Sequence, residues 1–165
     1  MNANQIAEAK KLLQEQKKIV IIPHRNPDGD AMGSTLALYH YLKQFQKDVI
    51  VISPNEFPGN LAFLPDSEKV LIFERNKEKA TQLLEEATLI FTLDFNALHR
   101  TGEMGLTLEK LKAPFIMIDH HETPDKYATV TYSDTTFGST CEMVYHFIAG
   151  MGDLNKINKT IATCL

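Results

Sequence analysis

Cysteine is scarce in this sequence, and long apolar segments are missing. The two cysteines, Cys141 and Cys164, are far apart in apolar helical contexts and lack CxxC spacing, which argues against a disulfide scaffold or a zinc site and predicts buried thiols. The longest apolar runs, such as residues 19–22 and 115–118, fall far short of the roughly 20 residues that span a bilayer. The polar N-terminus has no signal-peptide pattern, so we expect a cytoplasmic protein without a membrane partner.

An excess of positive charge is also absent. Lys and Arg number 17 against 21 for Asp and Glu, which gives a formal net charge of −4 with histidine neutral. This balance argues against the broad cationic surface that duplex DNA or an anionic membrane would require, so an anionic substrate must be attracted locally. Internal repeats, low-complexity tracts and Gly/Ser linkers are missing too, and we expect residues 1–165 to form one domain.

Short β-branched runs alternate with amphipathic stretches along the chain. The runs predict buried strands at residues 18–23, 49–52, 70–73, 89–93 and 115–118, and a more polar edge strand at 127–132. Helical spacing predicts helices at residues 5–18, 31–45, 78–86, 108–111 and 139–149, and either Asn155 or Asn158 caps a last one. This alternation is typical of an α/β fold with a doubly wound, mainly parallel sheet of about five or six strands and helices on both faces.

Acidic and histidine side chains follow the predicted strands at the point where each strand ends. They are His24, Asp28 and Asp30 after the first strand, Asp94 after the fourth, Asp119, His120 and His121 after the fifth, and Asp134 after the edge strand. Ligands of such sheets bind beyond the carboxyl ends of the strands. Carboxylates crowded there repel one another unless a cation is present. Mixed oxygen and nitrogen donors favour Mn²⁺ over Mg²⁺, and their number favours two ions.

The first of these segments combines a stiff turn with a helix start. Pro27 restricts the turn, and Gly29 is expected to adopt a backbone conformation closed to other residues, so that Asp28 and Asp30 point to different ions. The helix that follows, with Ser34 in its first turns, directs free N–H groups to the same edge. Asp30 is expected to serve partly as its cap.

Three motifs stand in order, each after a predicted strand: HRNPDGDAMGS from His24, TLDFNALHRTG around Asp94, and IDHHETP around His120. Together they resemble the DHH phosphoesterase superfamily. The form of the first motif and the later segment YSDTTFGSTCEMVYHFI are most similar to its bacterial oligoribonuclease and pAp-phosphatase (NrnA-like) branch. The likeness runs from about residue 19 to the last residue.

The resemblance implies a site for two Mn²⁺ ions, for which Mg²⁺ or Co²⁺ could substitute. It implies that His24 and Asp28 bind the first ion, that Asp30 and His120 bind the second, and that Asp94 lies between them. His121 would face the substrate phosphate and act in catalysis together with Asp94. The implied activity is a manganese-dependent hydrolysis of short single-stranded RNA, pAp or linear dinucleotides.

Two features of the family pattern are not found in this sequence. The family continues into a further strand whose Asp completes the second metal site, and its complete members carry a C-terminal substrate-binding (DHHA1-type) domain. We therefore expect residues 1–165 to be an N-terminal catalytic domain that is truncated, with weakened affinity for the second ion and little activity alone.

Further polar residues near the motifs are expected in supporting roles. The Asp119 carboxylate is expected to orient a histidine, and Asn26 and Asp134 to support the ligands from behind. For Asp134, the alternative is a purely structural role in the loop. Three residues are candidates for contact with the substrate phosphate: Ser34, His99 and Arg100. A solvated loop pair explains His99 and Arg100 nearly as well.

Three alternatives stay open from the sequence. A pyrophosphatase or exopolyphosphatase of the same superfamily would share every predicted metal ligand. A phosphorelay receiver also groups acids at strand ends, but it needs a lysine after the fifth strand, whereas Lys112 lies before that strand and Lys126 well after the DHH motif. A nucleotide-binding domain without activity is the third alternative. A homodimer also stays open.

Overall fold

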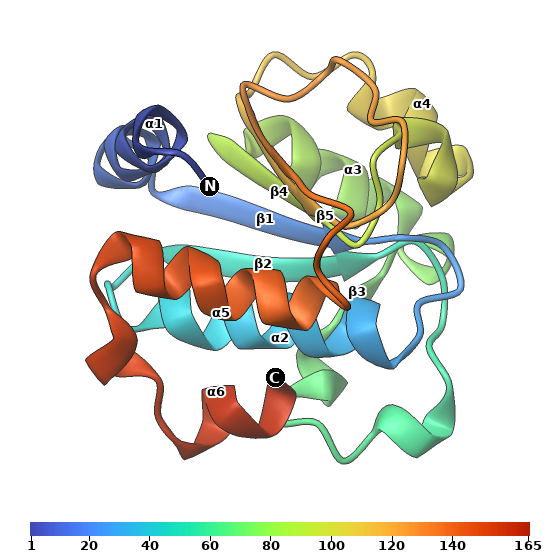
Figure 1. Cartoon of the computed structure of the whole chain (residues 1–165). Helices are drawn as coiled ribbons and strands as arrows, with labels where there is room; N and C mark the ends of the chain where they lie inside the picture. Colours follow the sequence, from blue (N-terminus) through green and yellow to red (C-terminus); the bar gives the residue numbers. More distant parts are fainter.

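A six-stranded sheet forms the centre of the protein, which a computed structural model describes over residues 1–165 (Figure 1). The strands lie in the order β3-β2-β1-β4-β5-β6, and every neighbouring pair is parallel. Their bounds are β1 Lys18–Pro23, β2 Asp48–Ser53, β3 Leu71–Ile72, β4 Leu89–Leu93, β5 Phe115–Asp119 and β6 Val130–Ser133. The predicted α/β fold is confirmed.

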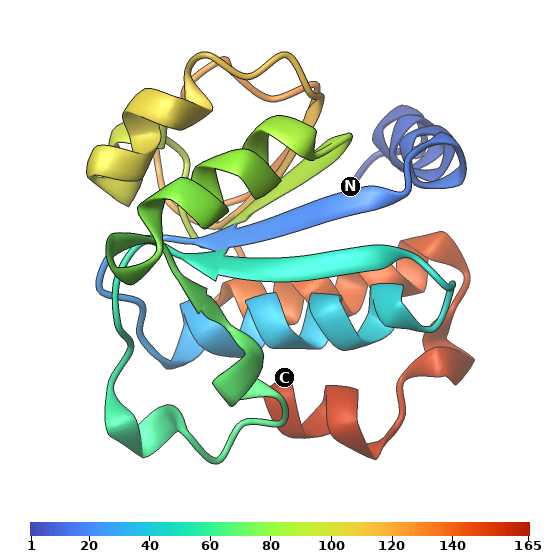
Figure 2. The ribbon, with the colours of Figure 1, turned by 180° about the vertical axis from the view of Figure 1, so that it is seen from behind.

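Helices cover both faces of the sheet, as predicted. Their bounds are α1 Ala3–Glu15, α2 Gly29–Lys43, α3 Lys77–Glu86, α4 Glu103–Leu108, α5 Thr140–Met151 and α6 Lys159–Cys164. Helices α1, α2 and α5 pack on one face, and α6 packs on α2 rather than on the sheet. Helices α3 and α4 pack on the other face, which Figure 2 shows from behind. None of these helices has the length and apolar character needed to cross a membrane.

The continuous apolar runs of the strands follow from this double cover. In β1, Ile19 and Ile21 point into the cluster beneath α2 and α5, whereas Val20 and Ile22 point into the cluster beneath α3 and α4. Successive side chains of a strand alternate between the two faces, so a strand covered on both sides needs apolar residues at every position. All four side chains are at most 2% exposed.

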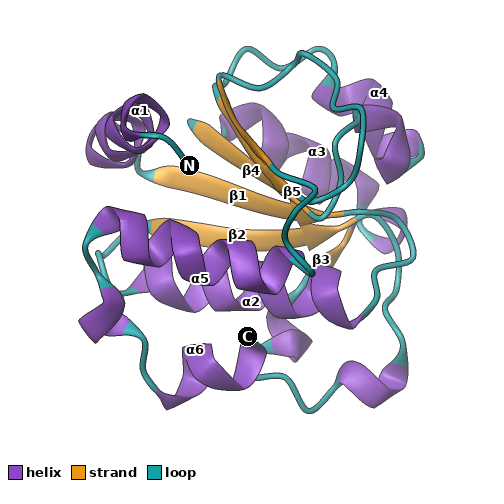
Figure 3. Cartoon of the chain, viewed as in Figure 1, coloured by secondary structure: helices purple, strands orange, loops and turns teal.

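The order of the strands places a crevice at the carboxyl end of the sheet. The chain runs from β1 outward to β2 and β3, and then returns to the other side of β1 with β4, β5 and β6. Such a reversal between β1 and β4 opens a crevice in which ligands of doubly wound sheets bind. In Figure 3, the loops that leave the carboxyl ends of these strands lie together at one end of the molecule.

Several element boundaries differ from those predicted. The helix expected at residues 108–111 is wrong: α4 spans Glu103–Leu108, and it buries Met104 and Leu108, which lie one helical turn apart on the same side. The predicted third strand is reduced to β3, because a 3₁₀ turn begins at Phe73. Asn158, not Asn155, caps α6 by accepting a hydrogen bond from the Ile161 N–H.

Close packing between α2 and α6 gives Gly33 its role. A Cβ atom at Gly33 would lie 2.5 Å from the Cys164 carbonyl oxygen and 3.0 Å from Cys141 Sγ. Both cysteines are free; Cys164 is buried, as predicted, and Cys141 is only partly buried.

We expect Gly33→Ala to lower the free energy of unfolding by about 1–3 kcal/mol, because the added methyl group must push α6 away from α2. Urea denaturation monitored by circular dichroism measures the change. Gly59→Ala is the matched control, because a Cβ there meets no atom within 4 Å, and it should shift the free energy by less than about 0.5 kcal/mol. Equal effects of the two substitutions would contradict this role of Gly33.

Candidate metal centre

Asp94 lies at the centre of the crevice, directly after β4. Its N–H donates to the Ile118 carbonyl of the neighbouring strand β5, and its backbone has a φ of 64°. This left-handed conformation is uncommon for residues other than glycine, although Asp and Asn tolerate it best. The side chain is only 3% exposed, and its Oδ1 accepts a hydrogen bond of 2.8 Å from the Thr140 hydroxyl at the start of α5.

A first group of donors joins the loop after β1 to Asp94. His24 Nε2 lies 3.5 Å from Asp94 Oδ2, and the His24 ring is fixed because its Nδ1 lies 2.8 Å from the Arg25 carbonyl oxygen. Asp28 contributes a carboxylate, so that one donor atom each from His24, Asp28 and Asp94 lies within 4.8 Å of the others. Asp28 also caps α2, because its Oδ1 accepts from the N–H groups of Asp30 and Ala31.

A second group of donors lies on the other side of Asp94. His120 Nε2 is 3.5 Å from Asp94 Oδ1 and 3.7 Å from Asp30 Oδ2. The His120 Nδ1 lies 3.3 Å from the Phe137 carbonyl oxygen, which again leaves Nε2 toward the carboxylates. Asp30 is held by the start of α5, where the N–H groups of Thr140 and Cys141 each donate to one of its oxygens at 2.8 Å. A helix N-terminus stabilises such a negative charge.

His121 is oriented by Asp119. Its Nδ1 lies 2.7 Å from Asp119 Oδ1, and its backbone N–H donates to Asp119 Oδ2. Asp119 is fully buried, whereas the His121 side chain is 38% exposed and thus reaches the open side of the crevice. His121 also lies close enough to Asp94 and His120 for one donor atom of each to fall within 4.8 Å. The geometry therefore allows His121 either to bind an ion or to face a substrate.

The donor set fits divalent cations. Neither Lys nor Arg forms an ion pair with Asp28, Asp30, Asp94 or Asp119, so the negative charge in the crevice has only imidazoles and N–H groups beside it. Ligands about 2.1 Å from one ion stand roughly 3–3.5 Å apart, which is close to the separations of the two Nε2 atoms from Asp94. The carbonyl contacts at both Nδ1 atoms are the usual way to aim Nε2 at a metal.

Charge in the crevice shifts the protonation of His24. Burial disfavours the charged imidazolium, but the hydrogen bond to Asp94, the contact with the Arg25 carbonyl and the negative charges of Asp94 and Asp28 together outweigh burial. They raise the pKa of His24 above its ordinary value.

Some predicted site residues lie away from the crevice. Ser34 is fully buried, and its hydroxyl donates to the Asp30 carbonyl within α2, so it does not face a substrate. The Asn26 side chain accepts from Asn55 in the loop after β2 rather than from any predicted ligand. His99 and Arg100 are exposed on a 3₁₀ turn without an ion pair to the candidate ligands, and the Arg100 carbonyl accepts from the Arg25 N–H.

Asp134 forms the turn before α5. Its Oδ1 accepts from both the N–H and the hydroxyl of Thr136, and the Thr136 hydroxyl lowers the pKa of Asp134. The Asp134 N–H donates to the Asp119 carbonyl. These contacts agree with a structural role for Asp134 in the loop that leads from β6 to α5.

Two expectations about the first motif are wrong. Gly29 does not have a positive φ; the positive φ values in this region belong to Asn26 at 55° and, across the crevice, to Asp94. Gly29 is instead the first helical residue of α2. The cap of α2 is Asp28, and Asp30 lies inside the first turn, where α5 holds its carboxylate.

Three residues of the site were missed or left undecided from the sequence. The Thr140 hydroxyl donates to Asp94. Buried Asn96 joins two loops, because its amide donates to the carbonyls of His121 and Glu122. Asn55 holds the first motif in place, because its side chain accepts from the Asn26 N–H and donates to Asn26 Oδ1. The sequence held a signal for Asn96 alone, because this residue lies two positions after the predicted ligand Asp94.

The arrangement of the three motifs corresponds to that of a known family. The DHH family, N-terminal domain, matches residues 18–165. The chain belongs to the DHH family. The resemblance found in the motifs is thereby confirmed, and membership decides against a phosphorelay receiver.

Named members of the DHH family resemble this chain over most of its length. An exopolyphosphatase-related protein from Bacteroides fragilis has a crystal structure with a TM-score of 0.97 and 41% identity, covering 99% of this chain and 48% of that chain. The bifunctional oligoribonuclease and PAP phosphatase NrnA of Thermus thermophilus is 32% identical over 134 residues, 81% of this chain and 37% of the relative. The cyclic-di-AMP phosphodiesterase GdpP of Bacillus subtilis is 25% identical over 94% of this chain and 25% of the relative. The chain thus spans less than half the length of each.

Proposed function

We propose that this chain is the metal-binding catalytic domain of a hydrolase that cleaves phosphate esters in short oligoribonucleotides, pAp or linear dinucleotides. One observation carries the proposal: the buried Asp94 carboxylate has a histidine Nε2 within 3.5 Å of each of its two oxygens. A carboxylate shared in this way suits a pair of ions. The names of the relatives, NrnA and GdpP, support phosphate esters of nucleotides as the substrate class.

Each candidate ligand has a defined place in this proposal. His24 and Asp28 would hold the first ion, Asp30 and His120 the second, and Asp94 would contact both. The proposed ions are Mn²⁺, with Mg²⁺ or Co²⁺ as substitutes, because the site combines imidazole nitrogens with carboxylates. Bound divalent ions supply activation of a water molecule and neutralisation of the charge that develops on the phosphate.

His121 is the proposed contact to the reacting phosphate. Asp119 fixes its Nδ1 at 2.7 Å, so the ring can carry a proton at Nε2 while its orientation is held. From the open side of the crevice, Nε2–H can donate to a phosphoryl oxygen or give its proton to the leaving oxygen.

A second substrate class has its own support. The Bacteroides fragilis protein with 41% identity is named as exopolyphosphatase-related, and a pyrophosphate or polyphosphate substrate would use the same ligands. We also propose that a C-terminal substrate-binding domain accompanies residues 1–165, because each of these relatives is more than twice the length of the part it shares with the chain.

A panel of substrates tests the proposed function. Release of phosphate or mononucleotide from pAp, a linear dinucleotide, a short RNA, pyrophosphate and polyphosphate would be measured with the chain and with the full natural protein. Each reaction would contain Mn²⁺, Mg²⁺ or excess EDTA. We expect metal-dependent release from the nucleotide substrates and loss of release in EDTA. Absence of metal-dependent release from every substrate would overturn the proposal, and release from polyphosphate alone would establish the second class.

The raised pKa of His24 predicts the pH dependence of metal binding. A proton on His24 competes with the ion for Nε2, so the apparent Mn²⁺ affinity should fall as pH falls through the raised pKa, by about tenfold per pH unit once His24 is protonated. The stability of the metal-free chain depends on pH in the opposite direction from Mn²⁺ affinity. Charged His24 beside Asp94 stabilises the fold below the ordinary pKa of 6.5, and this contribution is lost as pH rises through the raised value.

Calorimetric titrations with Mn²⁺ at several pH values measure the first effect, and urea denaturation of the metal-free chain measures the second. An Mn²⁺ affinity that does not change with pH across this range would contradict the role of His24 as a ligand.

A further inference from the structure

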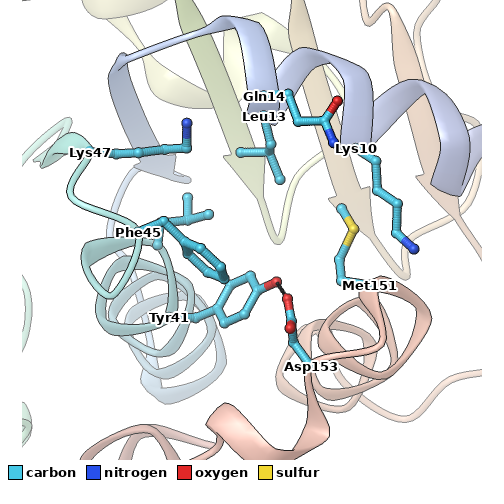
Figure 4. A pocket seen from close by; sticks show the side chains of 9 residues that line it. Lys10, Leu13, Gln14, Tyr41, Phe45, Lys47, Met151 and Asp153 are labelled. Carbon is cyan, nitrogen blue, oxygen red and sulfur yellow. Dashed lines mark hydrogen bonds between the residues drawn. The ribbon is translucent and has the colours of Figure 1, made fainter.

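A cavity of about 370 Å³ lies at the end of the protein opposite to the metal centre. It is bounded by α1, by the C-terminal ends of α2 and α5, and by the segment before β2 (Figure 4). Its apolar lining consists of Leu13, Tyr41, Leu42, Phe45 and Met151. Its volume falls in the range of roughly 300–1,000 Å³ that is usual for small-molecule sites.

Four lysines lie in or near this cavity, although the chain has a net charge of −4. Lys10 and Lys47 line it on opposite sides, with Leu13 and Gln14 between them in the view of Figure 4. Lys156 lies 5.0 Å from the centre of the Phe45 ring, and Lys17 is close enough to Lys47 to contribute to its lowered pKa, for which burial is the main cause. None of these four lysines forms a salt bridge.

Asp153 is the one carboxylate in the lining, and it is already engaged. Its Oδ2 accepts a short hydrogen bond of 2.6 Å from the Tyr41 hydroxyl, which Figure 4 shows at the floor of the cavity. It therefore faces Tyr41 rather than a lysine, but it keeps its negative charge and offsets one of the four lysine charges.

One of the lysines also has a structural role. The Lys47 Nζ donates to the Gln16 carbonyl at the end of α1, where a cation is favoured by the helix dipole. An ammonium group has three protons, so Lys47 keeps two for a ligand. Lys10 lies in the middle of α1, and its side chain has no hydrogen-bond partner. Unlike Lys47, it therefore makes no contact with the carbonyl groups at a helix end.

We propose that this cavity binds a small amphipathic anion. Its apolar body packs on Leu13, Phe45 and Met151, its anionic group is held by Lys47, and Lys10 on the opposite side of the cavity adds electrostatic attraction. The site is independent of the proposed phosphoesterase reaction. Asp28 and Tyr41 stand at opposite ends of α2, thirteen residues apart, so the cavity and the metal centre are separated by about 20 Å at 1.5 Å per residue. Ligand binding can therefore be measured without disturbing the metal ligands.

A pair of matched probes tests the proposal: decanoate, and 1-decanol as its uncharged counterpart. Each would be titrated into ¹⁵N-labelled chain while amide chemical shifts are recorded. We expect decanoate to shift the amides of residues that line the cavity and to bind more tightly than 1-decanol. Lys47→Gln should weaken decanoate about tenfold, the size expected for loss of a hydrogen bond to a charged group. Lys10→Gln should weaken it less, by about two- to fivefold, since it removes only electrostatic attraction, and both variants should leave 1-decanol unchanged.

Lys79→Gln, an exposed site on α3 at the other face of the sheet, is the control and should change neither affinity. Unchanged far-UV circular dichroism in all three variants would show that each is folded. Three results would overturn the proposal: no saturable binding of decanoate, equal decanoate affinity in Lys47→Gln and the unsubstituted chain, or shifts away from the cavity. Sedimentation that shows a dimer with this face covered would also overturn it, since a second copy would then be the occupant.

Discussion

Replacing Asp94 with Asn should abolish metal-dependent hydrolysis while the fold is kept. The substitution removes the one carboxylate that lies within 3.5 Å of both His24 Nε2 and His120 Nε2, so both proposed ions lose a ligand at once. Changes to residues that only orient metal ligands typically cost 10–100-fold, so we expect a loss of Mn²⁺ affinity of at least about 100-fold. Asn tolerates the φ of 64° at this position, so the backbone need not move.

Calorimetric titration with Mn²⁺ and thermal unfolding followed by circular dichroism would be carried out on the same preparation. Asp48→Asn, at the exposed start of β2 and remote from the crevice, is the matched control, since it removes a carboxylate without touching the site. Mn²⁺ affinity and turnover in Asp94→Asn equal to those of this control would refute the bridging role.

Substitution of the two neighbouring histidines should separate metal binding from the chemical step. His120→Asn is expected to weaken Mn²⁺ binding by about 10–100-fold or more, because Nε2 of His120 faces the carboxylates of Asp30 and Asp94. His121→Asn is expected to leave Mn²⁺ binding nearly unchanged and to lower kcat by about 10²–10⁴-fold, the usual contribution of a positioned general acid or base.

Each histidine variant serves as the control for the other, because the two residues are adjacent and their rings lie 4.5 Å apart. Mn²⁺ affinity would be measured by calorimetry, and kcat with saturating metal on the best substrate of the panel. If His121→Asn weakened Mn²⁺ binding as much as His120→Asn, the close approach of His121 to Asp94 would reflect metal ligation, and its proposed role toward the phosphate would be wrong.

The fold was predictable because the strands that build it are short, apolar on both faces and separated by helical stretches. Strand β1 is buried on both faces, with Ile21 in one apolar cluster and Val20 in the other. An uninterrupted β-branched run in the sequence is enough to predict this burial. The failures lie where tertiary contacts override local preference. Phe73 looks like the end of a strand, but it lies in a 3₁₀ turn and is buried in the same cluster as Ala80 and Leu84 of α3, so the packing of the following helix decides its conformation.

The convergence of the site was predictable for a topological reason. The carboxyl ends of β1, β4 and β5 meet at one edge of a parallel sheet, so His24, Asp94 and His120 had to lie near one another. The contacts that hold the ligands were not predictable. Thr140 and Asp94 are 46 residues apart, and their hydrogen bond depends on how α5 docks against α2.

Backbone strain was also assigned to the wrong residue. A glycine in a turn suggested a positive φ at Gly29, whereas the left-handed residues are Asn26 and Asp94. Asp and Asn reach this region more readily than other side chains, but their type alone does not say which of them does so.

Anomalous X-ray diffraction from crystals soaked with MnCl₂ is the most direct test of the proposed metal centre. Two anomalous peaks should flank the Asp94 carboxylate about 3.5–4 Å apart, one beside His24 and Asp28 and the other beside His120 and Asp30. A single peak beside His24 would show that the site binds one ion and would contradict the proposed second ion. Fully ordered crystals with no peak within bonding distance of Asp94 would contradict the metal centre itself.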